Sequence, residues 1–150
     1  MPPKICLACS AGGHLAEMMQ LKSFYSGYGH FFITFRRADT ESLAKSERVT
    51  FAELPGRNPL ATMKCFAQCM GAIRRENPGV IISTGADVGL VACIAGKLLG
   101  KKIVFIESFC RPSKPGLSGR MAYLFADLFI YQWKEMARFY PRGIFGGSIF

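Results

Sequence analysis

Acidic residues and long apolar segments are both scarce in this sequence. Ten Asp and Glu residues stand against nineteen Lys and Arg residues, which gives a formal net charge of +9. This excess favours anionic partners, namely nucleic acid, anionic lipid headgroups or phosphorylated substrates. No uncharged apolar run reaches the ~18 residues that a membrane span needs, and Met1–Lys4 leads directly into an apolar segment without the pattern of a secretory signal. We therefore expect a chain that does not cross a bilayer.

Cysteine is present, but not in the pattern of a disulfide framework or a zinc site. Cys6 and Cys9 form a C-x-x-C that lies along a predicted strand, and no second C-x-x-C or Cys/His pair accompanies it. Cys65, Cys69 and Cys93 lie in apolar segments, where a free thiol packs as a small hydrophobe. We expect reduced cysteines, as in the cytoplasm, and neither a metal ion nor a cofactor.

Apolar and amphipathic segments alternate along the chain, with short connections between them. This order predicts an α/β fold in which helices cover both sides of a parallel sheet. The expected strands are Lys4–Cys9, His30–Phe35, Val49–Leu54, Val80–Ile82, Ile103–Ile106 and Leu128–Tyr131. The expected helices are His14–Tyr25, Thr40–Ser46, Pro59–Arg75, Val88–Leu99 and Leu117–Phe125. Because half of the 150 residues are apolar and no linker divides them, we expect residues 1–150 to form one domain.

The predicted helix at Pro59–Arg75 has an unusually broad apolar face. Pro59 suits its first position. The apolar side chains are Leu60, Met63, Phe66, Ala67, Met70 and Ile73. Two interpretations remain open, because such a helix is either well buried or meets lipid or a partner chain. In the second case the basic residues along its border are Arg57, Lys64, Arg74 and Arg75.

The turn at Ser10–Leu15 joins the first predicted strand to the first predicted helix. Its sequence, Ser-Ala-Gly-Gly-His-Leu, leaves backbone N–H groups uncovered at the positive end of the helix, where phosphates and other anions bind. A second small-residue turn, Ser83–Gly89, opens a later helix at a corresponding place. We predict two phosphate-sized cradles at the carboxyl edge of the sheet. For the first turn alone, a plain strand-to-helix connection is the alternative.

Small and polar residues follow several predicted strands at their carboxyl ends, so we expect them to converge on one cleft. The candidates are Ser10, Gly12, Gly13, His14, Thr84, Gly85, Glu107, Ser108 and Gln132. The imidazole of His14 can accept a proton from a sugar hydroxyl, and its alternative is a hydrogen-bonded turn histidine. Glu107 is a base or a ligand for sugar hydroxyls, or else the ion-pair partner of Arg111 or Arg120.

Arg36 and Arg37 raise a different function. In dinucleotide-binding folds a basic residue near this place binds the 2′-phosphate of NADP, so a stand-alone NADP-dependent oxidoreductase is one alternative. The first turn, however, lacks the G-x-G-x-x-G spacing of such proteins. A basic adaptor that binds a partner and has no chemistry of its own is the other alternative.

Five short motifs, taken in order, resemble one group of proteins. They are Ser10–Leu15, Ser83–Ala86, Ile106–Ser108, Asp127–Ile130 with Gln132 and Trp133, and Gly146–Phe150. Together they resemble the bacterial exopolysaccharide and capsule proteins of the PssD/EpsE type. The eukaryotic relative of that group is the membrane-recruiting, Alg14-like subunit of the two-chain UDP-GlcNAc transferase of dolichol-linked glycan synthesis. The chain is more distantly similar to the N-terminal half of MurG-like GT-B glycosyltransferases.

The resemblance implies a Rossmann-like domain equivalent to the N-terminal, acceptor domain of a GT-B glycosyltransferase. The chain would be the acceptor-side subunit, bound peripherally at the cytoplasmic face of the cell membrane, and a separate catalytic chain would bind the UDP-sugar. The residues implied to hold a polyprenyl-diphosphate-linked saccharide are Ser10, Gly12, Gly13, Thr84, Gly85, Ser108 and Gln132, and those implied to assist its hydroxyl are His14 and Glu107.

Overall fold

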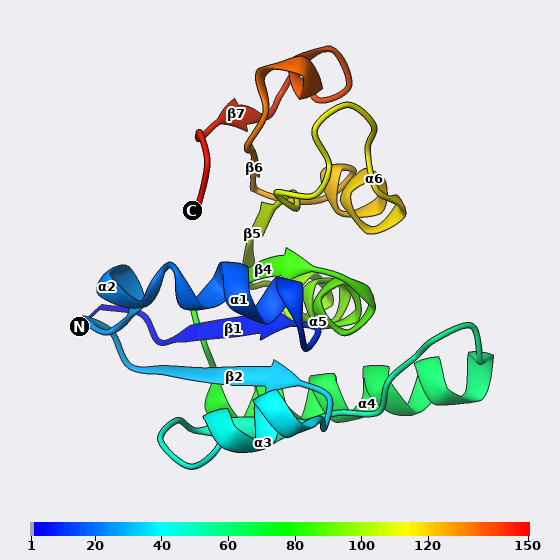
Figure 1. Cartoon of the computed structure of the whole chain (residues 1–150). Coiled ribbons are helices and arrows are strands. Elements are labelled where there is room, and N and C mark those ends of the chain that lie inside the picture. Colours follow the sequence, from blue (N-terminus) through cyan, green and yellow to red (C-terminus); the bar gives the residue numbers. More distant parts are fainter. Residues whose placement is uncertain (1) are drawn as a thin grey trace.

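A seven-stranded sheet forms the centre of the structure (Figure 1). The computed structural model describes residues 2–150. The strands are β1 (Ile5–Cys9), β2 (His30–Thr34), β3 (Val49–Phe51), β4 (Val80–Gly85), β5 (Lys102–Ile106), β6 (Leu128–Tyr131) and β7 (Ile144–Phe145). Their order is β3-β2-β1-β4-β5-β6-β7, and every pairing is parallel. The expected Rossmann-like sheet is confirmed, and β7 is a strand that the sequence did not predict.

Two layers of helices cover the sheet. They are α1 (Gly13–Met19), α2 (Lys22–Tyr25), α3 (Ala38–Leu43), α4 (Pro59–Glu76), α5 (Asp87–Leu98) and α6 (Leu117–Tyr123), and a 3-10 helix, η1 (Lys134–Arg138), precedes β7. Side chains of β1 alternate between the two layers. Cys6 and Ala8 pack with α4, α5 and α6, whereas Leu7 and Cys9 pack with α1, α2 and α3. The central strand is therefore buried on both faces, as its continuous apolar sequence requires.

The continuous helix expected over His14–Tyr25 is wrong. The chain turns after α1, where the Leu21 N–H donates to the Met18 carbonyl at 3.0 Å, and then continues as α2. The break accompanies the burial of Tyr25, whose ring packs edge-on against Phe32 of β2 with centroids 5.8 Å apart. Packing on the sheet thus overrides the helical periodicity of the sequence.

Helix α4 begins and ends as its sequence predicts. The Asn58 side chain accepts hydrogen bonds from two first-turn amides, Pro59 occupies the first helical position, and Asn77 ends the helix with a φ of 47°. Its C-terminal half is buried, but Leu60 and Met63 near its start are 76% and 68% exposed. Figure 1 shows these first turns of α4 reaching beyond the ends of β1 and β2. The buried interpretation therefore holds for the later turns of α4, whereas its first turns leave two large apolar side chains exposed.

The loops after β1 and β4 meet at the point where the strand order reverses. The Ser10 N–H donates to the Gly85 carbonyl at 2.9 Å, and the Ala86 N–H donates to Ser10 Oγ at 3.2 Å. Ligands of open α/β sheets bind outside the carboxyl ends of the strands at this point. The fold therefore brings the two small-residue turns of the sequence together, as predicted.

Candidate functional site

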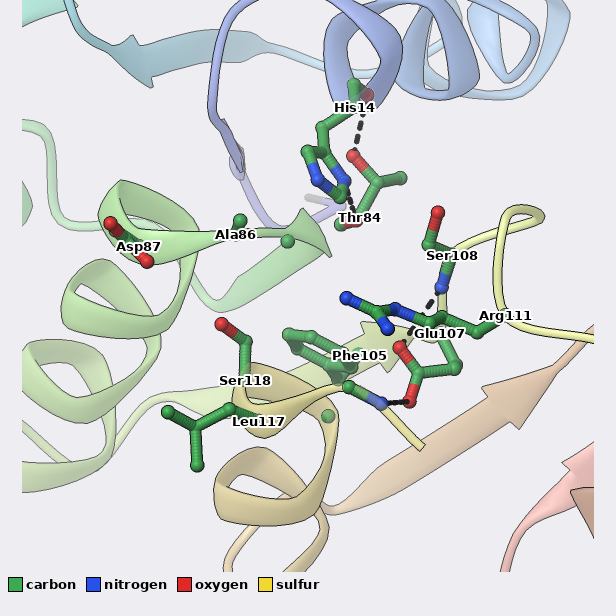
Figure 2. Close-up of a pocket in the computed structure, with 13 residues that line it drawn as sticks. His14, Thr84, Ala86, Asp87, Phe105, Glu107, Ser108, Arg111, Leu117 and Ser118 are labelled. Carbon is green, nitrogen blue, oxygen red and sulfur yellow. Dashed lines mark hydrogen bonds between the residues drawn. The ribbon is translucent and has the colours of Figure 1, made fainter. Parts of the chain in front are cut away.

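Two cavities lie at this carboxyl edge, and His14 contributes to the wall of both. The smaller, of about 220 Å³, is shown in Figure 2. Its lining comprises His14, Thr84, Gly85, Ala86, Asp87, Phe105, Glu107, Ser108, Arg111, Gly116, Leu117, Ser118 and Gly119. The larger, of about 460 Å³, is lined by Gly13, His14, Ala16, Glu17, Ser108, Phe109, Cys110, Arg111 and Phe150. His14 is thus placed where a ligand in either cavity would touch it.

The imidazole of His14 is fixed through one nitrogen only. Its Nδ1 lies 2.8 Å from the Thr84 carbonyl oxygen (Figure 2). A carbonyl can only accept, so Nδ1 carries the proton and the neutral ring has its lone pair on Nε2. The Thr84 hydroxyl donates in return to the His14 carbonyl at 2.7 Å. The side chain is 30% exposed, so it is both a hydrogen-bonded turn histidine and an accessible base.

The two predicted phosphate cradles are largely filled by the protein itself. The Gly12 N–H donates to Asp39 Oδ2 at 2.7 Å, and the Gly85 N–H donates to Ser83 Oγ at 3.0 Å. The Thr84 hydroxyl is likewise used within the fold. The expectation that these groups are free for a ligand is therefore corrected, because internal acceptors already occupy them.

The positive groups that do face the smaller cavity come from α5 and from Arg111. The first-turn amides of a helix have no acceptor within the helix, and α5 begins at the cavity wall with Asp87. The Arg111 guanidinium extends into the cavity from the opposite side, and Asp87 lies at the far end (Figure 2). Helix N-termini and arginine both favour phosphate oxygens. The donors of this kind that line the cavity therefore differ from those that the sequence suggested.

Glu107 organises the wall of this cavity. Its carboxylate is buried and accepts hydrogen bonds from the Ser108 N–H at 3.1 Å, the Gly116 N–H at 3.4 Å and the Tyr140 hydroxyl at 2.6 Å. Burial, together with this bond to the carboxylate, raises the pKa of Tyr140. Within residues 2–150 no Lys or Arg forms an ion pair with Glu107, so the ion-pair alternative is wrong. The carboxylate holds the loop after β5 against Tyr140.

The side chains of Gln132 and Ser108 also form hydrogen bonds within the protein. Gln132 Nε2 donates to Glu17 Oε1 and to the Glu107 carbonyl, both at 2.9 Å, and its Oε1 accepts from the Ile149 N–H at 2.9 Å. The Ser108 hydroxyl donates to Glu17 Oε2 at 3.3 Å. Gln132 lines neither of the two cavities, which corrects its predicted contact with an acceptor, whereas Ser108 lines both.

Glu17 and Arg111 are the site residues that the sequence did not single out for these roles. Glu17 is 2% exposed and lies one helical turn after His14, on the same face of α1. That spacing was the available signal. The sequence indicates Arg111 only as an ion-pair partner of Glu107, because nothing in the local sequence tells which way a loop arginine points.

One of the two arginines after β2 is engaged elsewhere. Arg36 pairs with Glu41 at 3.3 Å and lies over the Phe51 ring at 4.1 Å. Asp39 places a carboxylate on the Gly12 amide, at the turn where a dinucleotide pyrophosphate would bind. This arrangement disfavours the NADP-binding alternative.

The fold is that of one Rossmann-like domain of GT-B-type proteins. The structure resembles MurG of Acinetobacter baumannii with a TM-score of 0.73 and 13% sequence identity, over 87% of this chain and 41% of that one. It resembles the UDP-N-acetylglucosamine 2-epimerase of Rickettsia bellii with a TM-score of 0.79 and 12% identity, over 99% of this chain and 46% of that one. The expected equivalence to a GT-B N-terminal domain is confirmed.

The chain belongs to the family described as oligosaccharide biosynthesis protein Alg14 like, whose profile matches residues 55–149. It is 26% identical to the UDP-N-acetylglucosamine transferase subunit ALG14 of Eremothecium gossypii, over 99% of this chain and 81% of the relative. It is 24% identical to the Rattus norvegicus protein of the same description, over 97% of this chain and 82% of that relative. The family profile begins after the His14 turn, whereas both pairwise similarities extend over nearly the whole chain.

Proposed function

We propose that this chain is the acceptor-side subunit of a two-chain glycosyltransferase. The complete enzyme moves a sugar from a UDP-sugar to a polyprenyl-diphosphate-linked saccharide, in the synthesis of an exopolysaccharide or capsule. Residues 1–150 form a single domain, and a separate chain binds the UDP-sugar. Family membership and the likeness to subunits named as UDP-N-acetylglucosamine transferase components support this assignment.

The observation that carries the proposal is the placement of His14. Its unprotonated Nε2 is available at the wall shared by two cavities. The smaller cavity also holds the Arg111 guanidinium and the start of α5, which suit the phosphates of a lipid-linked acceptor. A base beside a phosphate site is the arrangement that a phosphorylated sugar acceptor needs.

The chemistry assigns one step to this chain. His14 Nε2 takes the proton of the acceptor hydroxyl as its oxygen forms a bond to the anomeric carbon of the donor sugar. The electrons of the donor glycosidic bond leave with UDP. Arg111 and the α5 amides, at the smaller cavity, hold the acceptor phosphates during this step. Gly13 lines the larger cavity, beside His14. The partner chain stabilises the departing UDP.

A GT-B site lies between two domains, and residues 1–150 correspond to one of them. This chain matches 41% of the Acinetobacter baumannii MurG chain. Both cavities lie at its carboxyl edge, and we propose that the partner chain supplies the second domain there. We expect little or no sugar transfer by this chain alone.

Exposed apolar side chains on α4, α5 and α6 support contact with the cytoplasmic face of the cell membrane. None of the helices within residues 2–150 is both long and apolar enough to span a bilayer. The exposed apolar residues of these helices include Leu60, Met63, Leu98, Leu117 and Met121, and Leu124 follows α6 directly. Of the expected basic border, Lys64 pairs with Glu53 and Arg75 lies 3.8 Å from Glu76. We propose that this surface, with the net charge of +9, binds anionic lipid headgroups.

A sugar-transfer assay tests the proposal. Membranes carrying a lipid-linked acceptor are incubated with a panel of radiolabelled UDP-sugars and with this chain, the product of the adjacent gene, or both. We expect transfer only with the pair, or transfer by the pair far above either chain alone. Robust transfer by this chain alone would contradict the two-chain assignment. Equal transfer by the adjacent gene product alone would reduce this chain to an adaptor.

A further inference from the structure

Glu17 is a buried carboxylate that connects three separate parts of the site. Its Oε1 accepts hydrogen bonds from the Phe109 N–H at 2.6 Å and from Gln132 Nε2 at 2.9 Å. Its Oε2 accepts from the Ser108 hydroxyl at 3.3 Å. The side chain is 3% exposed. Helix α1 is thus fastened to the loop after β5 and to the end of β6 through one residue.

The same carboxylate lies beside His14. Glu17 Oε2 is 3.7 Å from His14 Nδ1, and within residues 2–150 this histidine is the only basic side chain that the structure pairs with Glu17. The three hydrogen bonds come from neutral donors, which satisfy an ionised carboxylate but leave its charge uncompensated. A buried negative charge interacts more strongly with a neighbouring group than an exposed one does, because the effective dielectric constant is lower in the protein interior.

We propose that Glu17 is a positioning residue for His14: it fixes α1 against the cavity wall and stabilises the positive charge that His14 acquires when it takes a proton. The proposal rests on the proposed sugar transfer. The acceptor hydroxyl gives its proton to Nε2, its oxygen bonds to the anomeric carbon, and the donor bond breaks toward UDP. The resulting imidazolium has Nδ1–H on the Thr84 carbonyl and Glu17 beside it, and it later returns the proton to water.

The chain offers a matched control for this pair. His30 and Glu47 form the other His–Glu pair, with Nε2 and Oε2 2.9 Å apart, and neither residue lines the two cavities. Glu17→Gln removes the charge but keeps an acceptor for Phe109 and Gln132, and its amide can donate to the Ser108 hydroxyl. Glu47→Gln makes the same chemical change away from the site.

The first test observes the imidazole nitrogens directly. The isolated chain has only two histidines, so a long-range ¹H–¹⁵N spectrum of the labelled protein contains the Nδ1 and Nε2 signals of two rings only. We expect Glu17→Gln to change the ¹⁵N chemical shifts of His14 but not those of His30, and Glu47→Gln to change those of His30 but not those of His14. Both variants should unfold near the wild-type temperature. Unchanged His14 signals in the well-folded Glu17→Gln variant would overturn the proposal.

The second test measures transfer by the reconstituted pair. We expect Glu17→Gln to lower kcat at least about tenfold, within the roughly 10²–10⁴-fold that a positioned base contributes, with the acceptor KM unchanged. Glu47→Gln should transfer at the wild-type rate. The double variant His14→Ala with Glu17→Gln should be no slower than His14→Ala alone, and additive losses would overturn the proposal. An inactive wild-type pair would instead overturn the proposed function, and the nitrogen spectra would still decide the placement of His14.

Discussion

At the scale of single residues, the proposed chemistry depends on one imidazole nitrogen. We expect His14→Ala to lower transfer by the reconstituted pair about 100-fold or more, because the base that accepts the hydroxyl proton is lost. Initial rates at saturating UDP-sugar measure this, with co-purification of the partner as the check on assembly. His30→Ala is the control, since His30 pairs with Glu47 outside the cavities. Wild-type transfer by His14→Ala would support the adaptor alternative.

Gly85 provides a second prediction at this scale. A Cβ at this position would lie 3.2 Å from the His14 ring, on a backbone with φ of +97°. Gly100 has φ of +76° and nothing within 4 Å of such a Cβ. We expect Gly85→Ala and Gly100→Ala each to lower the free energy of unfolding by about 1–3 kcal/mol through backbone strain, measured in urea. Only Gly85→Ala should also move the His14 ring signals, and equal His14 spectra in both variants would contradict this.

At the scale of elements, α4 divides into a buried half and an exposed half. Leu60 and Met63 project from its first turns, next to a groove of about 440 Å³ lined by Thr62, Met63, Phe66, Ala67, Val91 and Ile94. Its later turns carry the buried Cys69, Ala72 and Ile73. The same apolar periodicity thus runs through an exposed segment and a buried one, because α4 extends beyond the end of the sheet (Figure 1).

The exposed half makes a testable contribution to membrane binding. Burying a large apolar side chain gains about 1.5–3 kcal/mol, so replacing Leu60 and Met63 by Asp should weaken binding to anionic vesicles at least about tenfold. Sedimentation with vesicles measures this. The thermal midpoint should stay unchanged, since both side chains are exposed. Phe24→Asp is the control, because Phe24 is 50% exposed on α2, which packs on the opposite face of the sheet. Equal vesicle binding by the variant and the wild type would contradict the proposed surface.

At the scale of the whole molecule, two carboxylates join distant segments. Burial opposes the ionisation of Glu76, but bonds to Lys4 at 3.1 Å and Arg48 at 2.6 Å outweigh it and lower its pKa. For Asp127, the hydrogen bond from the Ile103 N–H is the main cause of a lowered pKa. These bonds connect the starts of β1 and β3 to the end of α4, and the start of β5 to the start of β6.

These lowered pKa values predict a loss of stability in acid. The unfolded chain binds the protons more readily, so the stabilisation is present above the ordinary values of 4.5 and 3.8 and is lost as the pH falls through the lower folded values. Thermal midpoints between about pH 6 and pH 3 measure this. Asp127→Asn should flatten the decline. Glu53→Gln, which removes an exposed pair with Lys64, should keep the wild-type slope, and an unchanged slope in Asp127→Asn would contradict the assignment.

The sequence by itself determined the order of elements and most of their positions. Apolar runs, Pro59 and small-residue turns are local signals, so β1, β2, α4, α5 and β6 lie within a few residues of their predicted bounds. The meeting of the turns after β1 and β4 also followed, because parallel strands bring their carboxyl ends to one edge. His14 is predicted as a site residue for the same reason, because it follows the carboxyl end of β1.

Only the tertiary structure decided which of these groups remain available to a ligand. Asp39 reaches the Gly12 amide across 27 positions of the chain, and Gln132 reaches Glu17 across 115. Hydrogen bonds over such separations depend on how strands and helices pack, and no local pattern encodes them. The break between α1 and α2, the pairing of β7 and the burial of Glu17 have the same origin. The residue types of the site are thus read from the sequence, but their roles follow from contacts between segments far apart in it.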